Sequence, residues 1–166
     1  LSEAGTGFNH RAYLFQPGKR RCVMETLSAI LRDRNGTFES VFNSIAEGVV
    51  VADESGHFRF FNPVAEELLG LGPVCAGADK WSEMYGCYHL DEHTPYLTDE
   101  LPLSRALAGE HVTDEVMFIR NSRRPSGLYI NVTARPIISD DGSSQGGTAI
   151  FRDVTEQVKR HEQDCE

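Results

Sequence analysis

The sequence predicts an α+β fold in which a five-stranded antiparallel sheet carries short helices on one face. Three observations favour this class. Short runs rich in β-branched and aromatic residues alternate with turn residues, and a group of short helical segments falls between the second and third of these runs. The length of 166 residues suits one core with a flanking segment. Such a sheet has one covered and one free face.

Two segments precede the predicted sheet. Residues 1–18 are rich in glycine and lack hydrophobic periodicity, which indicates a mobile arm. Residues 19–35 predict an N-terminal flanking helix, because apolar side chains recur at helical steps (Val23, Leu27, Ile30 and Leu31). This apolar stripe either packs on its own domain or pairs with its copy in a second subunit, and the sequence leaves both open.

The first half of the predicted sheet is a hairpin. The segment Gly48 to Asp53 is typical of a strand, residues 54–56 of a tight turn, and His57 to Phe61 of the returning strand. A helix over 64–69 follows, because Pro63 suits a first helical turn and Gly70 a helix end.

The second half begins after an irregular stretch over residues 71–98. A short helix is predicted over 99–109, and three strands over 112–120, 128–138 and 147–153 complete the sheet. Residues 158–166 begin a charged C-terminal helix.

Composition excludes several classes of function. The net charge of −9 argues against binding to nucleic acid, and the short basic cluster at residues 19–21 is interpreted as a solvated helix start. The four cysteines show no Cys-x-x-Cys spacing, so a structural zinc site and a thioredoxin-like pair lack their signature. Nucleophile-elbow and phosphate-loop motifs are absent, so we expect no catalysis.

Localisation follows from hydropathy. No stretch approaches the roughly 20 apolar residues of a membrane helix, so we expect a cytoplasmic fragment without a membrane span of its own. Because the chain opens at Leu1, we expect it to be a piece of a longer protein, whose other parts could include a membrane anchor.

Four motifs occur in the order and spacing of a known family. They are Ile45 to Asp53 (IAEGVVVAD) followed by Gly56, Phe61 to Gly70 (FNPVAEELLG), Glu100 to Glu110 (ELPLSRALAGE) and Phe151 to Glu156 (FRDVTE), which matches an Asp-x-Thr exit motif. Together they cover residues 37–157, and the chain resembles the PAS family. The resemblance implies a sensory domain over 36–157, a cavity between sheet and helices, and a role in signalling within a histidine kinase, a cyclic-dinucleotide enzyme or a transcription regulator.

Strand alternation and the family register predict a mostly apolar ligand pocket for a small organic molecule. Its candidate residues are Val50, Phe60, Trp81, Met84, Tyr85, Val116, Phe118, Arg120, Val132, Ala149 and Phe151. The alternative is a core filled by its large side chains. Arg120 is expected to point inward near Glu83, Asp91 or a bound carboxylate, because a buried guanidinium needs an acceptor.

The segment around Cys87 bears on two classes of cofactor. A flavin adduct is disfavoured, because the Asn before this cysteine and the Arg and Gln after it, which the flavin-binding branch carries, are missing. Imidazoles at His89 and His93 beside Asp91 and Glu92 suit haem or a metal ion, but a solvated loop is the preferred interpretation.

Signal output is assigned to the strand-to-helix junction. Thr155 is predicted to cap the exit helix with its hydroxyl, while Asp153 bonds nearby backbone or a basic group. The outer sheet face is predicted to carry an apolar stripe (Val49, Val51, Met117, Ile119, Tyr129 and Ile150) that the N-terminal helix or a second subunit covers. We therefore expect a homodimer; a cargo-free dimerisation or spacer module is the alternative to a ligand sensor.

Overall fold

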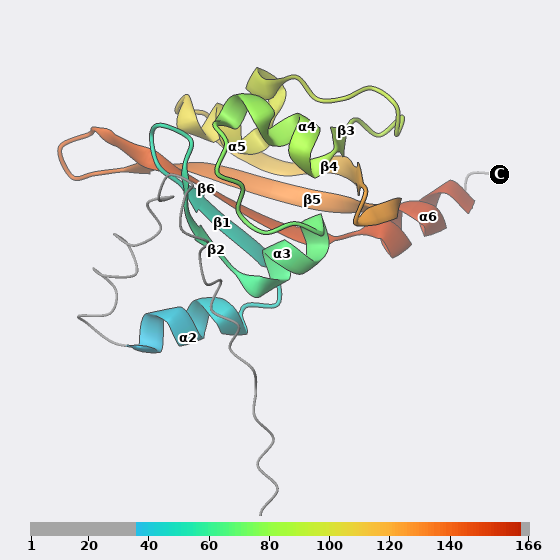
Figure 1. The fold of residues 1–166 in the computed structure, drawn as a ribbon, viewed down its shortest axis with the longest axis horizontal. Helices are drawn as coiled ribbons and strands as arrows, with labels where there is room; N and C mark the ends of the chain where they lie inside the picture. Colours follow the sequence, from blue (N-terminus) through green and yellow to red (C-terminus); the bar gives the residue numbers. More distant parts are fainter. Residues whose placement is uncertain (1–35, 164–166) are drawn as a thin grey trace, which may run out of the picture.

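A computed structural model describes residues 36–163, so the predicted arm and flanking helix over 1–35 lie outside the described residues. One antiparallel sheet of six strands, in the order β2-β1-β6-β5-β4-β3, forms the centre (Figure 1). The strands are β1 Gly48–Ala52, β2 Phe58–Phe61, β3 Cys87–Tyr88, β4 Val112–Asn121, β5 Arg124–Ile138 and β6 Ser144–Asp153. None of the described helices is long and apolar enough to cross a membrane.

Short helices connect and flank these strands. They are α2 Gly36–Ser44, α3 Pro63–Leu69, α4 Trp81–Tyr85, α5 Pro102–Leu107 and α6 Thr155–Gln163, with single 3-10 turns η1 Ala78–Lys80 and η2 Thr98–Glu100. Helices α4 and α5 lie over one face of the sheet, and α6 leaves from the end of β6 (Figure 1). The predicted α+β class is confirmed.

The sheet has one strand more than predicted. Strand β3 lies in the stretch expected to be irregular and pairs with β4 through Cys87↔Ile119 and Tyr88↔Phe118. A two-residue strand is too short to show a period of two, so alternation carries no signal for it. Strands β5 and β6 also begin earlier than predicted, at Arg124 and Ser144.

The start of α3 is fixed by a fully buried asparagine. The Asn62 Oδ1 atom accepts the N–H of Ala65 at 2.8 Å, which caps the helix, and the N–H of Val49 at 2.9 Å. Its Nδ2 donates to the carbonyl of Glu47 at 2.9 Å. One side chain with 0% exposure therefore joins α3, β1 and the segment before β1.

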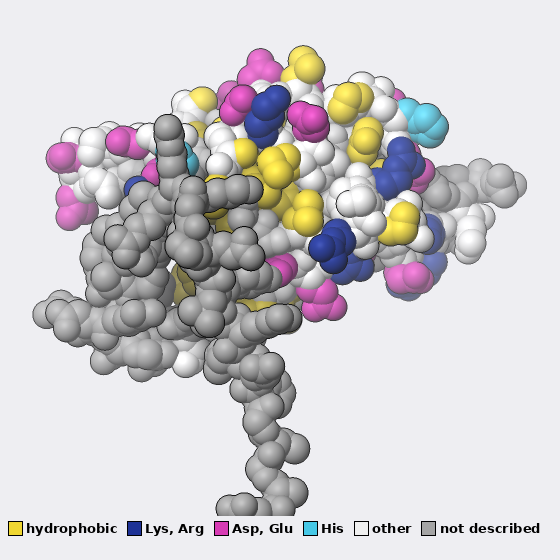
Figure 2. All heavy atoms as spheres, viewed as in Figure 1, with side chains coloured by type: hydrophobic (Ala, Val, Ile, Leu, Met, Phe, Trp, Pro, Cys, Tyr) yellow, Lys and Arg dark blue, Asp and Glu magenta, His cyan; other side chains and the backbone are white. Residues whose placement is uncertain are grey.

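Apolar residues pack on both faces of the sheet. The larger cluster lies between the inner face and α3, α4 and α5. A smaller cluster on the outer face joins Phe118, Tyr129 and Val154, with Tyr88, Val116 and Val158 packed against it. We call this smaller group the outer cluster. On the surface visible in Figure 2, basic and acidic side chains are interspersed and form no extended basic patch.

Candidate functional site

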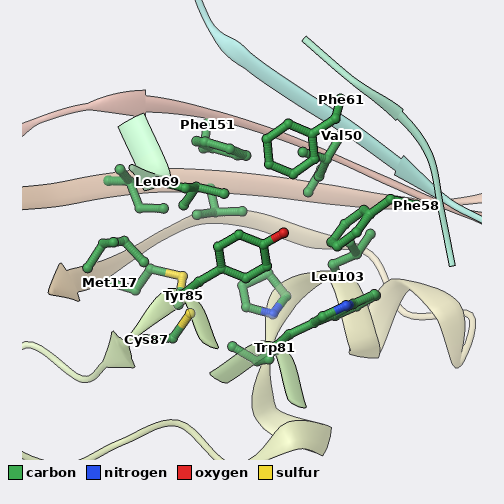
Figure 3. A pocket seen from close by; sticks show the side chains of 16 residues that line it. Val50, Phe58, Phe61, Leu69, Trp81, Tyr85, Cys87, Leu103, Met117 and Phe151 are labelled. Carbon is green, nitrogen blue, oxygen red and sulfur yellow. The ribbon is translucent and has the colours of Figure 1, made fainter. Parts of the chain in front are cut away.

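A cavity of about 80 Å³ lies between the inner face of the sheet and helices α3 to α5 (Figure 3). Among the residues that the structure describes, no charged side chain lines it. Its walls combine five aromatic side chains with aliphatic and sulfur-containing ones: Val50, Phe58, Phe61, Leu69, Trp81, Tyr85, Cys87, Leu101, Pro102, Leu103, Met117, Ile119, Ile130, Val132, Ala149 and Phe151. An apolar lining of this kind favours uncharged molecules.

The structure places part of the predicted pocket at this cavity. Among the predicted residues, those that line it are Val50, Trp81, Tyr85, Val132, Ala149 and Phe151. Sequence reasoning missed the contributions of α3 and α5, such as Leu69 and Leu103, because a helix face is aimed by tertiary packing. The alternation of β5 already indicated that Ile130 shares a face with Val132.

The prediction for β4 was wrong by one residue. Met117 and Ile119 line the cavity, whereas Val116 and Phe118 belong to the outer face. The cause is a β-bulge: the register runs from Val112↔Ala134 to Glu115↔Val132, so β4 holds one extra residue there. The bulge contains Asp114 at φ 53, and it reverses the faces of every later residue in the strand.

Arg120 consequently does not reach the cavity. Its Nη2 donates to the carbonyl oxygen of Glu92 at 2.8 Å, and its guanidinium lies 5.2 Å from the ring centroid of Tyr88. The predicted partners, Glu83, Asp91 or a bound carboxylate, are thus replaced by a backbone carbonyl and an aromatic ring. Since this cation faces away from the cavity, it gives no reason to expect an anionic ligand.

Two more predicted pocket residues lie elsewhere. Strand β2 also holds an extra residue, because its register passes from Val51↔Phe60 to Ala52↔Phe58. Phe58 and Phe61 therefore face the cavity, while the ring of Phe60 packs edge-on against Phe42 of α2 at 4.6 Å. Met84 of α4 is 41% exposed and is not among the residues that line the cavity.

Three polar groups border the cavity. The hydroxyl of Tyr85 donates to the carbonyl of Gly72 at 2.9 Å and accepts the N–H of Val74 at 3.2 Å, and burial raises its pKa. Burial also raises the pKa of the Cys87 thiol to about 12, which keeps it protonated at neutral pH. The indole N–H of Trp81 is buried and has no acceptor among residues 36–163, and its ring stacks on that of Phe58 with 4.9 Å between the ring centroids.

Hydrogen bonds organise the loop that carries His89 and His93. The ring of His89 stacks on Tyr96 at 3.9 Å, and its Nε2 lies 3.5 Å from Glu100 Oε2. The Asp91 carboxylate accepts the backbone N–H groups of His93 and Thr94. Within residues 36–163 no group of three or more His, Cys, Asp or Glu side chains is arranged to hold a metal ion.

A family profile described as the PAS fold matches residues 42–159. The chain belongs to the PAS-fold family. It is 26% identical over 119 residues to the sensor protein kinase WalK of Staphylococcus aureus, covering 72% of this chain and 25% of that protein. The chain thus spans about a quarter of this curated relative.

Solved structures share the PAS architecture. An RNA-binding light-oxygen-voltage receptor is 21% identical with a TM-score of 0.53, and the likeness covers 82% of this chain and 36% of that one. The PAS domain of BvgS from Bordetella pertussis is 12% identical with a TM-score of 0.49, covering 82% and 96%. The chain is therefore a PAS sensory domain of the kind found in histidine kinases.

The exit motif of this PAS domain matches the prediction at Asp153, which bonds nearby backbone, and differs from it at Thr155. The Thr155 hydroxyl does not cap α6; it accepts the N–H of Tyr129 at 2.9 Å. The Asp153 Oδ1 instead accepts the N–H of Thr155 at 2.8 Å, and the N–H of Val154 donates to the carbonyl of Tyr129 at 2.8 Å. The start of α6 is thus hydrogen-bonded to β5 through both the backbone N–H and the backbone carbonyl of Tyr129.

Proposed function

We propose that this PAS domain is a sensory module that binds a small uncharged molecule in its cavity and reports occupancy through α6 to an effector domain. The cavity is the observation that carries the proposal: it lies between the sheet and three helices, its lining is apolar, and β6, which leads to α6, forms part of its wall. The likeness to a sensor kinase supports a parent protein of the two-component type in the cytoplasm. We propose that this parent protein also has kinase activity.

The cavity also limits the ligand. Its volume of about 80 Å³ is roughly half that of the engineered cavity of about 150 Å³ that holds benzene, so about three or four heavy atoms fit without expansion. Charged molecules are disfavoured because no lining side chain pairs with them. The unpaired indole N–H of Trp81 supports a ligand with one hydrogen-bond acceptor, such as a carbonyl oxygen.

Acetone and isobutene test this class of ligand, because they have the same shape and differ in the acceptor. We expect acetone to perturb the NMR signals of cavity residues and the fluorescence of Trp81, which is the single tryptophan of the chain. In Trp81→Phe, the NMR-measured preference for acetone over isobutene should fall by about fivefold to tenfold, as expected for one lost hydrogen bond. If acetone at saturating concentration leaves the NMR signals of the cavity residues unchanged, ligand binding is refuted and the cargo-free spacer module is favoured.

The haem or metal alternative has a separate readout. A Soret band in protein supplied with haem, lost in His89→Ala or His93→Ala, would replace the small-molecule proposal with a haem sensor. The solvated, hydrogen-bonded loop supports the absence of such a band.

We further propose that the PAS domain forms a homodimer through its outer sheet face and the N-terminal flanking helix. The support is an exposed apolar residue on this face: Ile150 in β6 is 39% exposed. The predicted outer stripe loses Met117 and Ile119, which line the cavity, but keeps Val49, Val51, Tyr129 and Ile150. Sedimentation should show a dimer that weakens in Ile150→Asp, with the exposed Thr113→Asp as control; a monomer at high concentration refutes the assignment.

A further inference from the structure

The loop between β3 and η2 is tied to the outer face of the sheet through Glu92. The hydroxyl of Tyr129 donates to Glu92 Oε1 at 2.6 Å, and Arg120 donates to the Glu92 carbonyl oxygen at 2.8 Å. Glu92 is held at φ 61, a left-handed conformation that is uncommon for a residue with a side chain. Its position is therefore imposed by these contacts and by the loop around it.

The loop itself is a closed, hydrogen-bonded unit. The N–H of His89 donates to the carbonyl of Thr94 at 2.9 Å, and the N–H of Glu92 donates to the carbonyl of His89 at 3.0 Å. The Asp91 carboxylate accepts the backbone N–H groups of His93 and Thr94. These hydrogen bonds make the loop a compact unit that directly follows β3.

The loop also has a short connection to the cavity. Cys87, which lines the cavity, is the first residue of β3, and the loop follows directly after Tyr88. The residue before β3 is bonded to β4 as well, since the N–H of Arg120 donates to the carbonyl of Gly86 at 2.8 Å. Arg120 thus holds both the entry to β3 and, through its side chain, Glu92.

Tyr129 links this loop to the exit helix. Its ring is buried in the outer cluster, 4.9 Å from that of Phe118 and packed with Val154. Its backbone N–H and carbonyl are hydrogen-bonded to Thr155 and Val154 at the start of α6. The same residue therefore contacts the loop through its hydroxyl and α6 through its backbone.

We propose that the Glu92–Tyr129 hydrogen bond is a latch that couples the loop after β3 to the docking of α6. With the latch closed, Tyr129 is fixed against the outer cluster and holds α6 at β5. A displacement of β3 withdraws Glu92 from the Tyr129 hydroxyl and loosens the start of α6. The input through the cavity rests on the proposed ligand function; the mechanical coupling between loop and helix does not.

Hydrogen exchange of the whole chain, measured by mass spectrometry without added ligand, tests the latch. Tyr129→Phe removes the hydroxyl and keeps the ring, and should speed exchange of the α6 backbone by about tenfold, the lower end for a lost hydrogen bond to a charged acceptor. Glu92→Ala should do the same, since alanine at this φ leaves the backbone strain unchanged. Glu92→Gln keeps an acceptor for the hydroxyl and should stay within about twofold of the wild type.

The double variant Glu92→Ala/Tyr129→Phe should exchange no faster than either single variant, because both remove the same bond. Unchanged exchange of α6 in Tyr129→Phe overturns the latch. Equal acceleration in β1 also overturns it, since the effect would then be global unfolding. Additive acceleration in the double variant would show two independent effects and no coupling. Acetone binding is scored separately, so a failed latch leaves the ligand proposal standing, and the reverse holds too.

Discussion

The buried Asn62 makes a quantitative prediction about the stability of the fold. In Asn62→Ala, α3 loses its N-cap, which costs about 1 kcal/mol. The buried N–H of Val49 and carbonyl of Glu47 also lose their side-chain partner, and unpaired groups of this kind cost about 1–3 kcal/mol. Because the side chain is fully buried, solvent does not screen the loss. We expect the free energy of unfolding to fall by about 2–4 kcal/mol.

Urea denaturation monitored by circular dichroism measures this loss. The midpoint should move while the slope stays the same, because the surface exposed on unfolding is unchanged. Asn43→Ala is the matched control: it makes the same chemical change on the exposed side of α2 and should stay within about 0.5 kcal/mol of the wild type. A loss below about 1 kcal/mol in Asn62→Ala would contradict the assignment of Asn62 as the joint between α3 and β1.

Two further predictions concern titrating groups. Because the pKa of Cys87 is about 12, iodoacetamide at pH 8 should alkylate it about a thousandfold more slowly than the exposed Cys75. Peptide mapping measures the two rates, and comparable rates would contradict the burial of the Cys87 thiol. Hydrogen bonds from Thr94 and His93 lower the pKa of Asp91 to about 2, below the ordinary 3.8, so its stabilisation of the loop is complete above about pH 4 and is lost as the pH falls toward 2. The NMR shift of the Thr94 amide should titrate with that midpoint and stop titrating in Asp91→Asn; a midpoint near 3.8 would show that these bonds do not form.

The exit motif illustrates how far local sequence reasoning reaches. The sequence indicated that Asp153 and Thr155 stand where the last strand becomes a helix, and the helix does begin at Thr155. It did not indicate that the Thr155 hydroxyl would bond to Tyr129, which lies 26 residues earlier. A threonine at a helix start has the same local pattern whether it caps its own helix or accepts from a neighbouring strand.

Period, helix-end and turn residues are local, and they determined the α+β class, the hairpin before α3, the helix between Pro63 and Gly70 and the inward alternation of β5. Tertiary structure decided which face of β4 and β2 meets the cavity, because single bulged residues at Asp114 and in β2 reverse the alternation without altering the apolar pattern, and both faces of β4 are apolar. It also decided the roles of Arg120 and Glu92. Their partners come from other segments of the chain, so those contacts exist only once the sheet has brought the segments together.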